Sequence, residues 1–465
     1  MTDGTTIPPL CKALPIVGEL PFLLSKKLDH FIELRAQYGD IFTLDVGLMK
    51  IVCLCNPAHA QHVLRDQAKN YSKGGALWDA LRGIFGNGLP VSEGTFWMRQ
   101  RRMIQPHFHR ESLAKMAELM VEAIDEEIDT WDKYARSGES FDLFSEMTHI
   151  TMRVIVKTVF GSELEKAQAD RMAEAMRYML DYVFVSMATR SLPAWVPVPG
   201  RKRFQEAVAT SDKIIFEVIE QRNRVPDRRG GALIDMLIES VDADTNERMT
   251  HQELRDEAVS FFLAGYETTS AALGFAFREL NRHPRILREV IDEIDTVLGD
   301  RRPTLADTRK LSRCLGVVQE SMRLNSPSYW LPRTALEDDV IDGFAISKGQ
   351  EVGVMTHVIH RHPDVWPDPN RFDPDRFLPD AVQARNPLAW LPFSAGQRQC
   401  IGKEFALMEG QFILARILAK YDVRPAYQAE ATAVVGAALR PGGGVMIRIT
   451  KRNAHKSADV QLSPN

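Results

Sequence analysis

The ten residues Phe393-Ser-Ala-Gly-Gln-Arg-Gln-Cys-Ile-Gly402 decide how this 465-residue chain is interpreted, because they place Cys400 between two glycines and beside an arginine. Gly396 and Gly402 can adopt backbone conformations closed to other residues, and neither has a side chain that would obstruct a flat ring lying against the loop. Arg398 adds a fixed positive charge. Apolar residues recur at helical spacing after Cys400, which predicts that the cysteine lies at or just before a helix N-terminus. There the helix dipole and unpaired N–H groups would lower the pKa of the thiol.

The same cysteine can also be a small apolar residue buried at a turn. The two glycines, Arg398 and Phe393 favour a binding loop instead. The pattern F-x-x-G-x-R-x-C-x-G resembles the haem-binding loop of the cytochrome P-450 family. This resemblance implies that Cys400 is the axial thiolate ligand of the iron and that the cofactor is haem b, iron protoporphyrin IX.

Composition and charge place the chain among ordinary globular proteins, with 45% hydrophobic and 26% charged residues. A net charge of -4 gives no reason to expect nucleic acid as a partner. An odd number of cysteines favours a reducing compartment over a disulfide framework. Residues 1–24 contain neither a secretory signal pattern nor an apolar run near the roughly 20 residues that a membrane span needs. We therefore expect a cytoplasmic protein without a transmembrane anchor, similar to soluble bacterial members of the family.

The order of patterns along the chain predicts one domain, mainly α with a minor β portion near both ends of the sequence. Separated β segments must meet in space to pair, which favours a single body over several. We divide residues 1–465 into a Pro-rich arm at 1–25, a catalytic body at 26–450 and a disordered tail at 451–465. The resemblance implies the cytochrome P-450 fold, with a long central helix over the haem and the cysteine loop on its proximal side.

Four segments carry specific expectations of secondary structure. Residues 40–55 and 329–356 predict short strands. The Pro-rich segment 361–396 should contain no regular helix. Residues 432–449 predict a final hairpin that turns at Pro441-Gly-Gly-Gly444.

Residues 251–282 contain no proline and predict one long helix, whose middle reads Ala264-Gly-Tyr-Glu-Thr-Thr269. Gly265 weakens a helix by about 1 kcal/mol relative to alanine. Thr268 can donate its hydroxyl to the Ala264 carbonyl, and together these features predict a local distortion. A glycine at a tight helix crossing beside a solvated glutamate is the alternative.

This stretch resembles the A-G-x-E-T segment of the central helix in the cytochrome P-450 family. The resemblance implies that Ala264 and Gly265 border the haem, that Thr268 hydrogen-bonds bound dioxygen and that Glu267 helps relay protons. The acid and alcohol pair favours monooxygenase over isomerase or peroxide-only chemistry.

Glu320 and Arg323 would share one helix face, where such a pair commonly contributes only about 0.2–0.5 kcal/mol at a surface. They also resemble the E-x-x-R motif of the family, and Pro374-Asp-Arg-Phe377 resembles its P-x-R-F motif. By this resemblance Glu320, Arg323 and Arg376 form a buried charge network that fixes the cysteine loop.

Further cationic positions resemble the propionate-binding residues of the family. Trp97 and Arg101 match its W-x-x-x-R spacing, and Arg333 follows Pro332 downstream of the E-x-x-R motif. An arginine is usually a solvated surface residue, but guanidinium groups bind carboxylates bidentately and haem carries two propionates. The resemblance therefore assigns Trp97, Arg101, Arg333 and Arg398 to the propionates.

The function implied by the resemblance is a haem-thiolate monooxygenase that inserts one oxygen atom of O₂ into a lipophilic substrate by hydroxylation or epoxidation. No reductase domain follows the final hairpin, so we expect electrons from a separate ferredoxin or flavodoxin with its NAD(P)H-dependent reductase. Arg99, Arg102 and Lys403 are the charges expected to attract such an acidic carrier. A haem-thiolate sensor or carrier without turnover, and a non-haem α-rich binding module, are the alternatives.

The segments that line the substrate pocket in the family are largely apolar in this chain. They predict a terpenoid, steroid, fatty acid or macrolide substrate. The segments are Leu77–Leu81, Ile84-Phe85, Phe261-Phe262, Tyr329–Leu331 and Val434-Val435.

Overall fold

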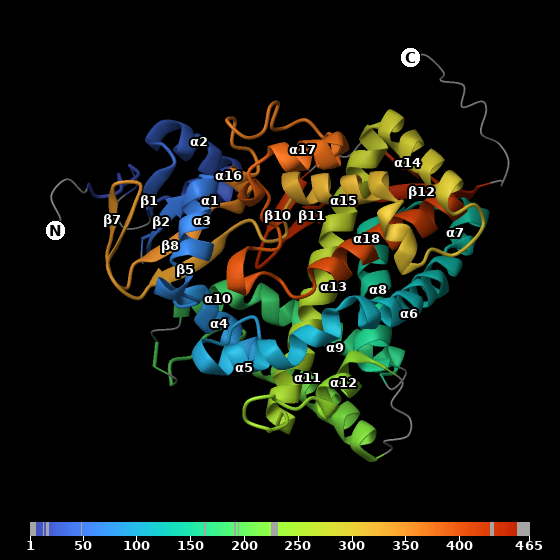
Figure 1. Cartoon of the computed structure of the whole chain (residues 1–465), viewed down its shortest axis with the longest axis horizontal. Helices are drawn as coiled ribbons and strands as arrows, with labels where there is room; N and C mark the ends of the chain where they lie inside the picture. Colours follow the sequence, from blue (N-terminus) through green and yellow to red (C-terminus); the bar gives the residue numbers. More distant parts are fainter. Residues whose placement is uncertain are drawn as a thin grey trace.

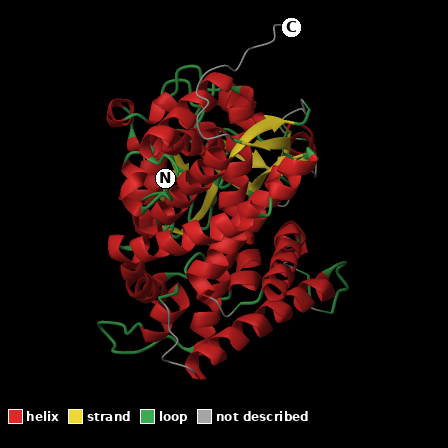
Figure 2. Ribbon diagram, turned by 90° about the vertical axis from the view of Figure 1, so that its right-hand side faces the viewer, coloured by secondary structure: helices red, strands yellow, loops and turns green. Residues whose placement is uncertain are grey.

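The computed structural model of the chain describes residues 6–452 except 13, 15–17, 48, 162–163, 190–191, 194, 225–230 and 428–431. Helices dominate the described part, and the strands form small sheets among them (Figures 1 and 2). The predicted class, mainly α with a minor β portion, is confirmed. Nearly all of the tail predicted at 451–465 lies outside the described residues. Among the residues that the structure describes, no helix has the length and apolarity that crossing a lipid bilayer requires.

The helices in chain order are α1 (Leu20–Lys26), α2 (Asp29–Tyr38), α3 (Pro57–Gln61), α4 (Ala76–Phe85), α5 (Gly94–Ile104), α6 (Arg110–Asp129), α7 (Asp132–Ser137), α8 (Leu143–Ile155), α9 (Lys166–Asp181), α10 (Val183–Thr189), α11 (Arg201–Arg224), α12 (Leu233–Glu239), α13 (His251–Arg282), α14 (Pro284–Val297), α15 (Ser312–Leu324), α16 (Thr356–Ile359), α17 (Pro379–Ala384) and α18 (Lys403–Lys420). The strands are β1 (Ile41–Asp45), β2 (Lys50–Leu54), β3 (Tyr71–Ser72), β4 (Phe141–Asp142), β5 (Leu331–Ala335), β6 (Asp339–Ile341), β7 (Phe344–Ile346), β8 (Glu351–Val354), β9 (Tyr421–Pro425), β10 (Thr432–Val435), β11 (Leu439–Gly442) and β12 (Met446–Lys451).

The largest sheet joins strands from distant parts of the sequence in the order β1-β2-β8-β5-β3. Its central pair is parallel, with Val52 of β2 opposite Val352 of β8. Figure 1 shows β1, β2, β5 and β8 together on the left, beside α1 and α3, whereas most long helices lie on the right. The strands predicted at 40–55 and 329–356 are therefore confirmed, and they meet as expected.

The C-terminal strands do not form the single hairpin predicted over 432–449. β10 and β11 pair around residues 436–438, with Val435 opposite Leu439. β12 pairs instead with β9 and β4 in a separate three-stranded sheet. Gly443 and Gly444, both at φ 76°, link the two sheets. The predicted turn was wrong because a glycine run marks a change of direction without specifying which strands it connects.

Two short helices occur where none was expected. α17 lies in the Pro-rich segment 361–396, and α1 overlaps the predicted N-terminal arm. Each has a proline in its first turn, where the missing N–H has no partner to lose within the helix. Proline content therefore excludes long helices here but not single turns that begin at the proline.

α13 matches the long helix predicted at 251–282 and crosses the middle of the molecule (Figure 1). Thr250 caps it, since its hydroxyl accepts from the Glu253 N–H at 3.2 Å while the Glu253 carboxylate accepts from the Thr250 N–H at 2.7 Å. Such reciprocal capping satisfies two N–H groups that the first turn leaves unpaired. Most of the helix is buried, so it forms the axis on which α8, α15 and α18 pack.

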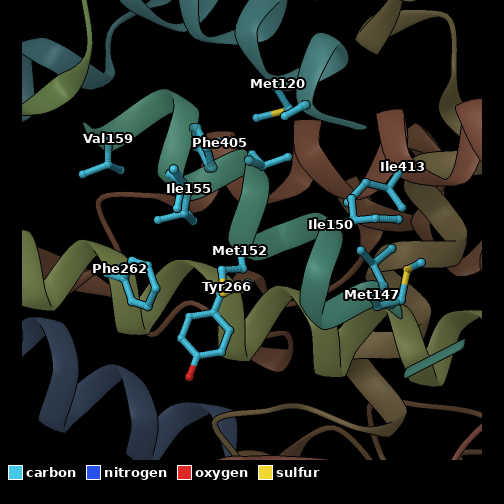
Figure 3. Close-up of a cluster of buried hydrophobic side chains, with 14 of the residues drawn as sticks. Met120, Met147, Ile150, Met152, Ile155, Val159, Phe262, Tyr266, Phe405 and Ile413 are labelled. Carbon is cyan, nitrogen blue, oxygen red and sulfur yellow. The ribbon is translucent and has the colours of Figure 1, made fainter. Parts of the chain in front are cut away.

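The main apolar core surrounds this axis and includes the helix that follows Cys400. Figure 3 shows Ile413 of α18 near Ile150 and Met147 of α8. All three side chains are fully buried. The core therefore holds α18 firmly, and α18 in turn positions the loop at its N-terminus.

Truncating Ile413 tests this anchoring. We expect Ile413→Ala to lower the free energy of unfolding by about 2–5 kcal/mol, because it removes buried methyl groups and leaves a cavity. Ile413→Val, the matched control, should cost only about 0.5–1.5 kcal/mol. Urea unfolding followed by far-ultraviolet circular dichroism measures both. Equal stability of the two variants would contradict the packing described here.

Candidate functional site

A cavity of about 330 Å³ lies between α13 and the loop that carries Cys400. Nine of the residues predicted for the site line it, from α5, α13 and the loop: Trp97, Arg101, Ala264, Gly265, Thr268, Phe393, Arg398, Cys400 and Gly402. Glu267, Arg333 and Gly396 lie outside the lining, as do Glu320, Arg323 and Arg376. The structure thus brings together residues separated by up to about three hundred positions in the sequence.

Cys400 lies deep in the protein, yet its side chain is open to the cavity. Its N–H donates to the Phe393 carbonyl at 2.9 Å, which closes the loop, and α18 begins three residues later at Lys403. Burial raises the pKa of the thiol, while the Gly402 N–H and the charges of Arg101 and Lys73 oppose this rise. The expected lowering was therefore wrong for the protein alone, because desolvation outweighs the nearby positive charge.

The two glycines of the loop serve different purposes. A Cβ added to Gly402 would have the Cys400 Sγ, at 4.0 Å, as its only neighbour within that range, so this position is open beside the thiol. Gly396 has φ 68°, and an added Cβ would lie 1.9 Å from the Leu64 carbonyl oxygen. Gly396 is therefore required by contact with the backbone of residues 62–66 rather than by the ring.

Arg398 is held on three sides. Its guanidinium lies 3.8 Å from the centre of the Trp97 ring, donates to the Ser92 carbonyl at 2.8 Å and pairs with Glu93. Arg101, on the same helix as Trp97, donates to the Gln399 carbonyl at 3.0 Å. Stacking and backbone carbonyls orient both cations, and Glu93 offsets the charge of Arg398 only.

Arg333 is buried, and its guanidinium donates to the carbonyl of Pro332 at 2.8 Å. Burial, together with the charge of Arg398, lowers the pKa of Arg333 to about 10. Lys73, which no sequence pattern marks, also lines the cavity and donates its ammonium to the Pro90 carbonyl at 2.6 Å. Burial, with the charges of Arg333 and Arg398, holds the pKa of Lys73 well below its usual range.

These four cations test whether a haem fits the site. Glu93 pairs with Arg398, but no described carboxylate lies within ion-pair distance of Lys73, Arg101 or Arg333. Buried charges are ordinarily paired. A dianionic group offsets such an excess, and haem has two propionates. The thiol, the open glycine and the unpaired cations therefore fit haem at one cavity.

α13 runs past this cavity as one continuous helix. Thr268 donates its hydroxyl to the Ala264 carbonyl at 2.7 Å, as predicted, but the helix is not interrupted. A Cβ on Gly265 would lie 2.3 Å from the Ile155 side chain of α8. Gly265 thus also matches the alternative of a tight helix crossing, and the distortion is confined to the threonine hydrogen bond.

Glu267 faces away from the cavity lining and is only 8% exposed. Its carboxylate lies 3.6 Å from Arg440 of β11, and Arg440 also pairs with Asp181 of α9 at 3.1 Å. Burial raises the pKa of Glu267, and the charge of Arg440 opposes the rise. Sequence reasoning did not identify Arg440 or Asp181, because only the folded chain brings the C-terminal hairpin to α13.

The predicted charge network of α15 is present. Arg323 donates from Nε to Glu320 Oε2 at 2.6 Å and from Nη2 to Oε1 at 2.8 Å, and both residues are fully buried. Arg376 lies 3.5 Å from the same Glu320 carboxylate. Arg323 also donates to the carbonyls of His360 and Pro369, at 2.8 and 2.6 Å.

His360 links this network to the cysteine loop. Its Nε2 accepts from the Leu391 N–H at 2.7 Å, which leaves the proton on Nδ1, 3.0 Å from the Arg323 carbonyl. Burial and the charge of Arg323 hold the pKa of His360 well below its usual range, so the imidazole is neutral. The start of the loop is therefore tied to α15 through one buried ring.

A thiol presented to a cavity beside a threonine-bearing helix and unpaired cations defines a haem-thiolate protein. The sequence profile of the Cytochrome P-450 family matches residues 8–438. This chain belongs to the cytochrome P-450 family. It is a haem-thiolate monooxygenase, an oxidoreductase with haem b as cofactor.

Two bacterial relatives and one solved structure illustrate the similarity. The chain is 31% identical to cyclooctat-9-en-7-ol 5-monooxygenase of Streptomyces melanosporofaciens, across 89% of this chain and 88% of that protein. It is 28% identical to pentalenene oxygenase of Streptomyces avermitilis, across 95% and 96%. A crystal structure of a cytochrome P-450 haem domain superposes with a TM-score of 0.88 at 26% identity, across 97% and 99%.

Removing Glu320 tests the buried network. We expect Glu320→Ala to lower the free energy of unfolding by about 3–5 kcal/mol, because Arg323 would be left buried without its carboxylate. Glu220→Ala, which breaks an exposed pair with Arg224, is the matched control and should unfold like the parent protein. Chemical unfolding followed by circular dichroism distinguishes them. A Glu320→Ala protein as stable as its control would show that the network is not needed.

Proposed function

We propose that this monooxygenase oxidises a lipophilic terpenoid-type substrate and that Thr268 and Glu267 manage its protons. The observation that carries the proposal is the Cys400 thiol open to the same cavity that Thr268 lines. Haem b, when bound through a cysteine thiolate, supplies the activation of O₂ that transfers one oxygen atom to substrate and releases the other as water.

The proposed substrate class rests on the cavity wall and on the relatives. Away from the cation cluster the lining is mostly apolar, and from the five segments named above it includes Phe261 and Leu331. The other residues of those five segments do not line this cavity, so for them the prediction was wrong. Two relatives are named for cyclooctat-9-en-7-ol and pentalenene, which are terpenoids, and this favours a terpenoid over a steroid, fatty acid or macrolide.

The residues proposed for the haem divide into three roles. Cys400 would bind the iron. Lys73, Arg101, Arg333 and Arg398 would bind the propionates, with Trp97 supporting Arg398. Phe393, Gly402, Ala264 and Gly265 would border the ring, while Gly396, Glu320, Arg323 and Arg376 hold the loop in place.

Protons would reach the cavity along α13. Thr268 lines the cavity, and its hydroxyl is held by the Ala264 carbonyl at 2.7 Å, so its oxygen can accept a hydrogen bond from a ligand. Glu267, the residue before Thr268, lies 3.6 Å from Arg440, and Arg440 pairs with Asp181, whose side chain is 54% exposed. These ion pairs link Glu267 to the protein surface. Because a guanidinium keeps its proton, Arg440 would orient the Glu267 carboxylate rather than pass a proton on.

Electrons would come from a separate ferredoxin or flavodoxin and its reductase. All three charges expected to dock it have acidic neighbours. Arg99 pairs with Glu253 at 2.7 Å, and Arg102 pairs with Asp242 at 2.6 Å. Lys403 lies 3.6 Å from Glu404. Each of the three charges thus has an acidic neighbour, and the carrier is proposed from the monooxygenase chemistry.

The ligand of the iron is the first test. The reduced protein should give a carbon monoxide complex with the red-shifted absorption of thiolate ligation, and Cys400→His should absorb like a histidine-ligated globin. Circular dichroism controls for folding of the variant. If the parent protein itself absorbs like a globin, the proposed ligand and its chemistry are wrong.

The Thr268→Ala variant distinguishes a monooxygenase from a haem-thiolate sensor that does not turn over substrate. We expect about 10–100 times less product per electron pair and more hydrogen peroxide, because the cavity loses its hydroxyl for proton management. Thr210→Ala is the matched control, since Thr210 makes the same hydrogen bond, to Glu206, on α11 far from the cavity. Product and peroxide are measured together at a fixed rate of electron supply. A sensor would be indifferent to both substitutions.

A further inference from the structure

The segment Gly86–Glu93, between α4 and α5, is hydrogen-bonded to α13 through its backbone. The Asn87 N–H donates to Asp256 at 2.8 Å. The Leu89 N–H donates to both carboxylate oxygens of Glu257, at 3.0 and 3.1 Å. Two consecutive acids of α13 therefore hold two amides of this segment.

Two glycines bring the segment unusually close to α13. Gly86 has φ 59°, and a Cβ there would lie 2.3 Å from the Asp256 carboxylate. A Cβ on Gly88 would lie 2.3 Å from the Ser260 hydroxyl oxygen and 2.7 Å from the Asp256 carbonyl oxygen. Because one obstacle at Gly88 is backbone, any side chain at that position must lift the segment off the helix.

The other end of the same segment holds the cations of the cavity. The Pro90 carbonyl accepts from the Lys73 ammonium at 2.6 Å, and the Ser92 carbonyl accepts from Arg398 at 2.8 Å. The Glu93 carboxylate accepts from the Lys73 N–H at 2.8 Å and pairs with Arg398. Backbone oxygens of one short segment thus fix where the buried Lys73 and the half-buried Arg398 lie.

Glu257, the α13 acid that accepts from the Leu89 N–H, is buried. It is 1% exposed, lines the cavity and has no described cation within ion-pair distance. Burial raises the pKa of Glu257 to about 8, and the Leu89 N–H opposes the rise. A carboxyl group costs free energy in such a place unless it is hydrogen-bonded, and its hydrogen bonds go to the segment.

We propose that Gly86–Glu93 is a cation strap: a backbone segment, fastened to α13 by Glu257, that holds Lys73 and Arg398 in position for the haem propionates. Glu257 is a positioning residue, since it acts through Leu89 and the strap. Like charges in a crowded cluster repel one another. Carbonyl groups that are already fixed hold these cations in place, so less free energy is lost in ordering them when the anion binds. The proposal rests on the assignment of Lys73 and Arg398 to the propionates.

Haem retention tests the strap in the resting ferric holoprotein, without substrate or electron donor. We expect Glu257→Leu, which removes both acceptors, to speed haem transfer to excess apomyoglobin by about tenfold or more. Glu257→Gln keeps one acceptor and should show a smaller increase. Hydrogen exchange followed by mass spectrometry should show faster exchange of the amides of residues 86–93 in both variants.

A matched control separates positioning from loss of general stability. Ile294→Ala removes a fully buried side chain of α14 that does not line the cavity. Under denaturant conditions that equalise the unfolding free energies, it should release haem at the parent rate while Glu257→Leu does not. If both release haem equally fast, Glu257 contributes only stability and the proposal is overturned.

Gly88→Ala tests the strap without changing any charge, and it stands in if Glu257→Leu does not fold. We expect faster haem transfer and faster exchange of residues 86–93. Gly83→Ala, on α4 where the added Cβ meets only Phe204 at 3.5 Å, should resemble the parent. Unchanged haem transfer in Gly88→Ala and Glu257→Gln would overturn the proposal. None of these measurements requires turnover. The strap proposal can therefore be wrong while the Thr268 and Cys400 tests support the proposed function, and it can be right while those tests fail.

Discussion

Positive charge crowded beside one cavity, half of it buried and half partly buried, is the constraint on which the site depends. Lys73, Arg101, Arg333 and Arg398 come from four parts of the chain, and Glu93 is their one described ion-pair partner. Burial is costly for a cation, and crowding with other cations adds to the cost. The protein surrounds the charges with carbonyl oxygens and an indole ring, and the two carboxylates of haem would complete the pairing.

The thiol depends on a second set of buried charges on the other side of the loop. Glu320 and Arg323 neutralise one another, and the neutral ring of His360 connects Arg323 to the Leu391 N–H. The apolar packing of α18 fixes the opposite end. The loop is therefore restrained at both ends before any metal is bound, which is the condition for a ligand to meet iron at a defined position.

Sequence patterns predicted the parts of the fold that are local or carried by a motif. The uninterrupted run at 251–282 predicted α13. The motifs around Cys400 and Thr268 predicted residues that the structure does place around one cavity, and the spacing of Glu320 and Arg323 predicted their buried pair. The C-terminal hairpin was mispredicted because strand pairing is long-range, and glycine at 442–444 is compatible with several partners. The short helices α1 and α17 were not predicted, because a helix of one or two turns has too little periodicity to detect.

The predictions that failed within the site concern residues whose importance arises only from tertiary contact. Lys73, Glu257 and Arg440 lie in no recognisable pattern, yet each contacts a residue more than 15 positions away: Pro90, Leu89 and Glu267. Likewise, helix position alone gave the wrong direction for the Cys400 pKa. Burial, which the sequence does not reveal at this position, outweighs the neighbouring charges there.

The contact between Gly396 and the Leu64 carbonyl has a consequence for how the molecule is made. It joins the cysteine loop to the first sixth of the chain, and the cation cluster likewise draws on residues from 73 to 398. A ribosome has synthesised most of this polypeptide before the last of those groups emerges. The groups proposed to hold the cofactor are therefore not all available until most of the chain has been made.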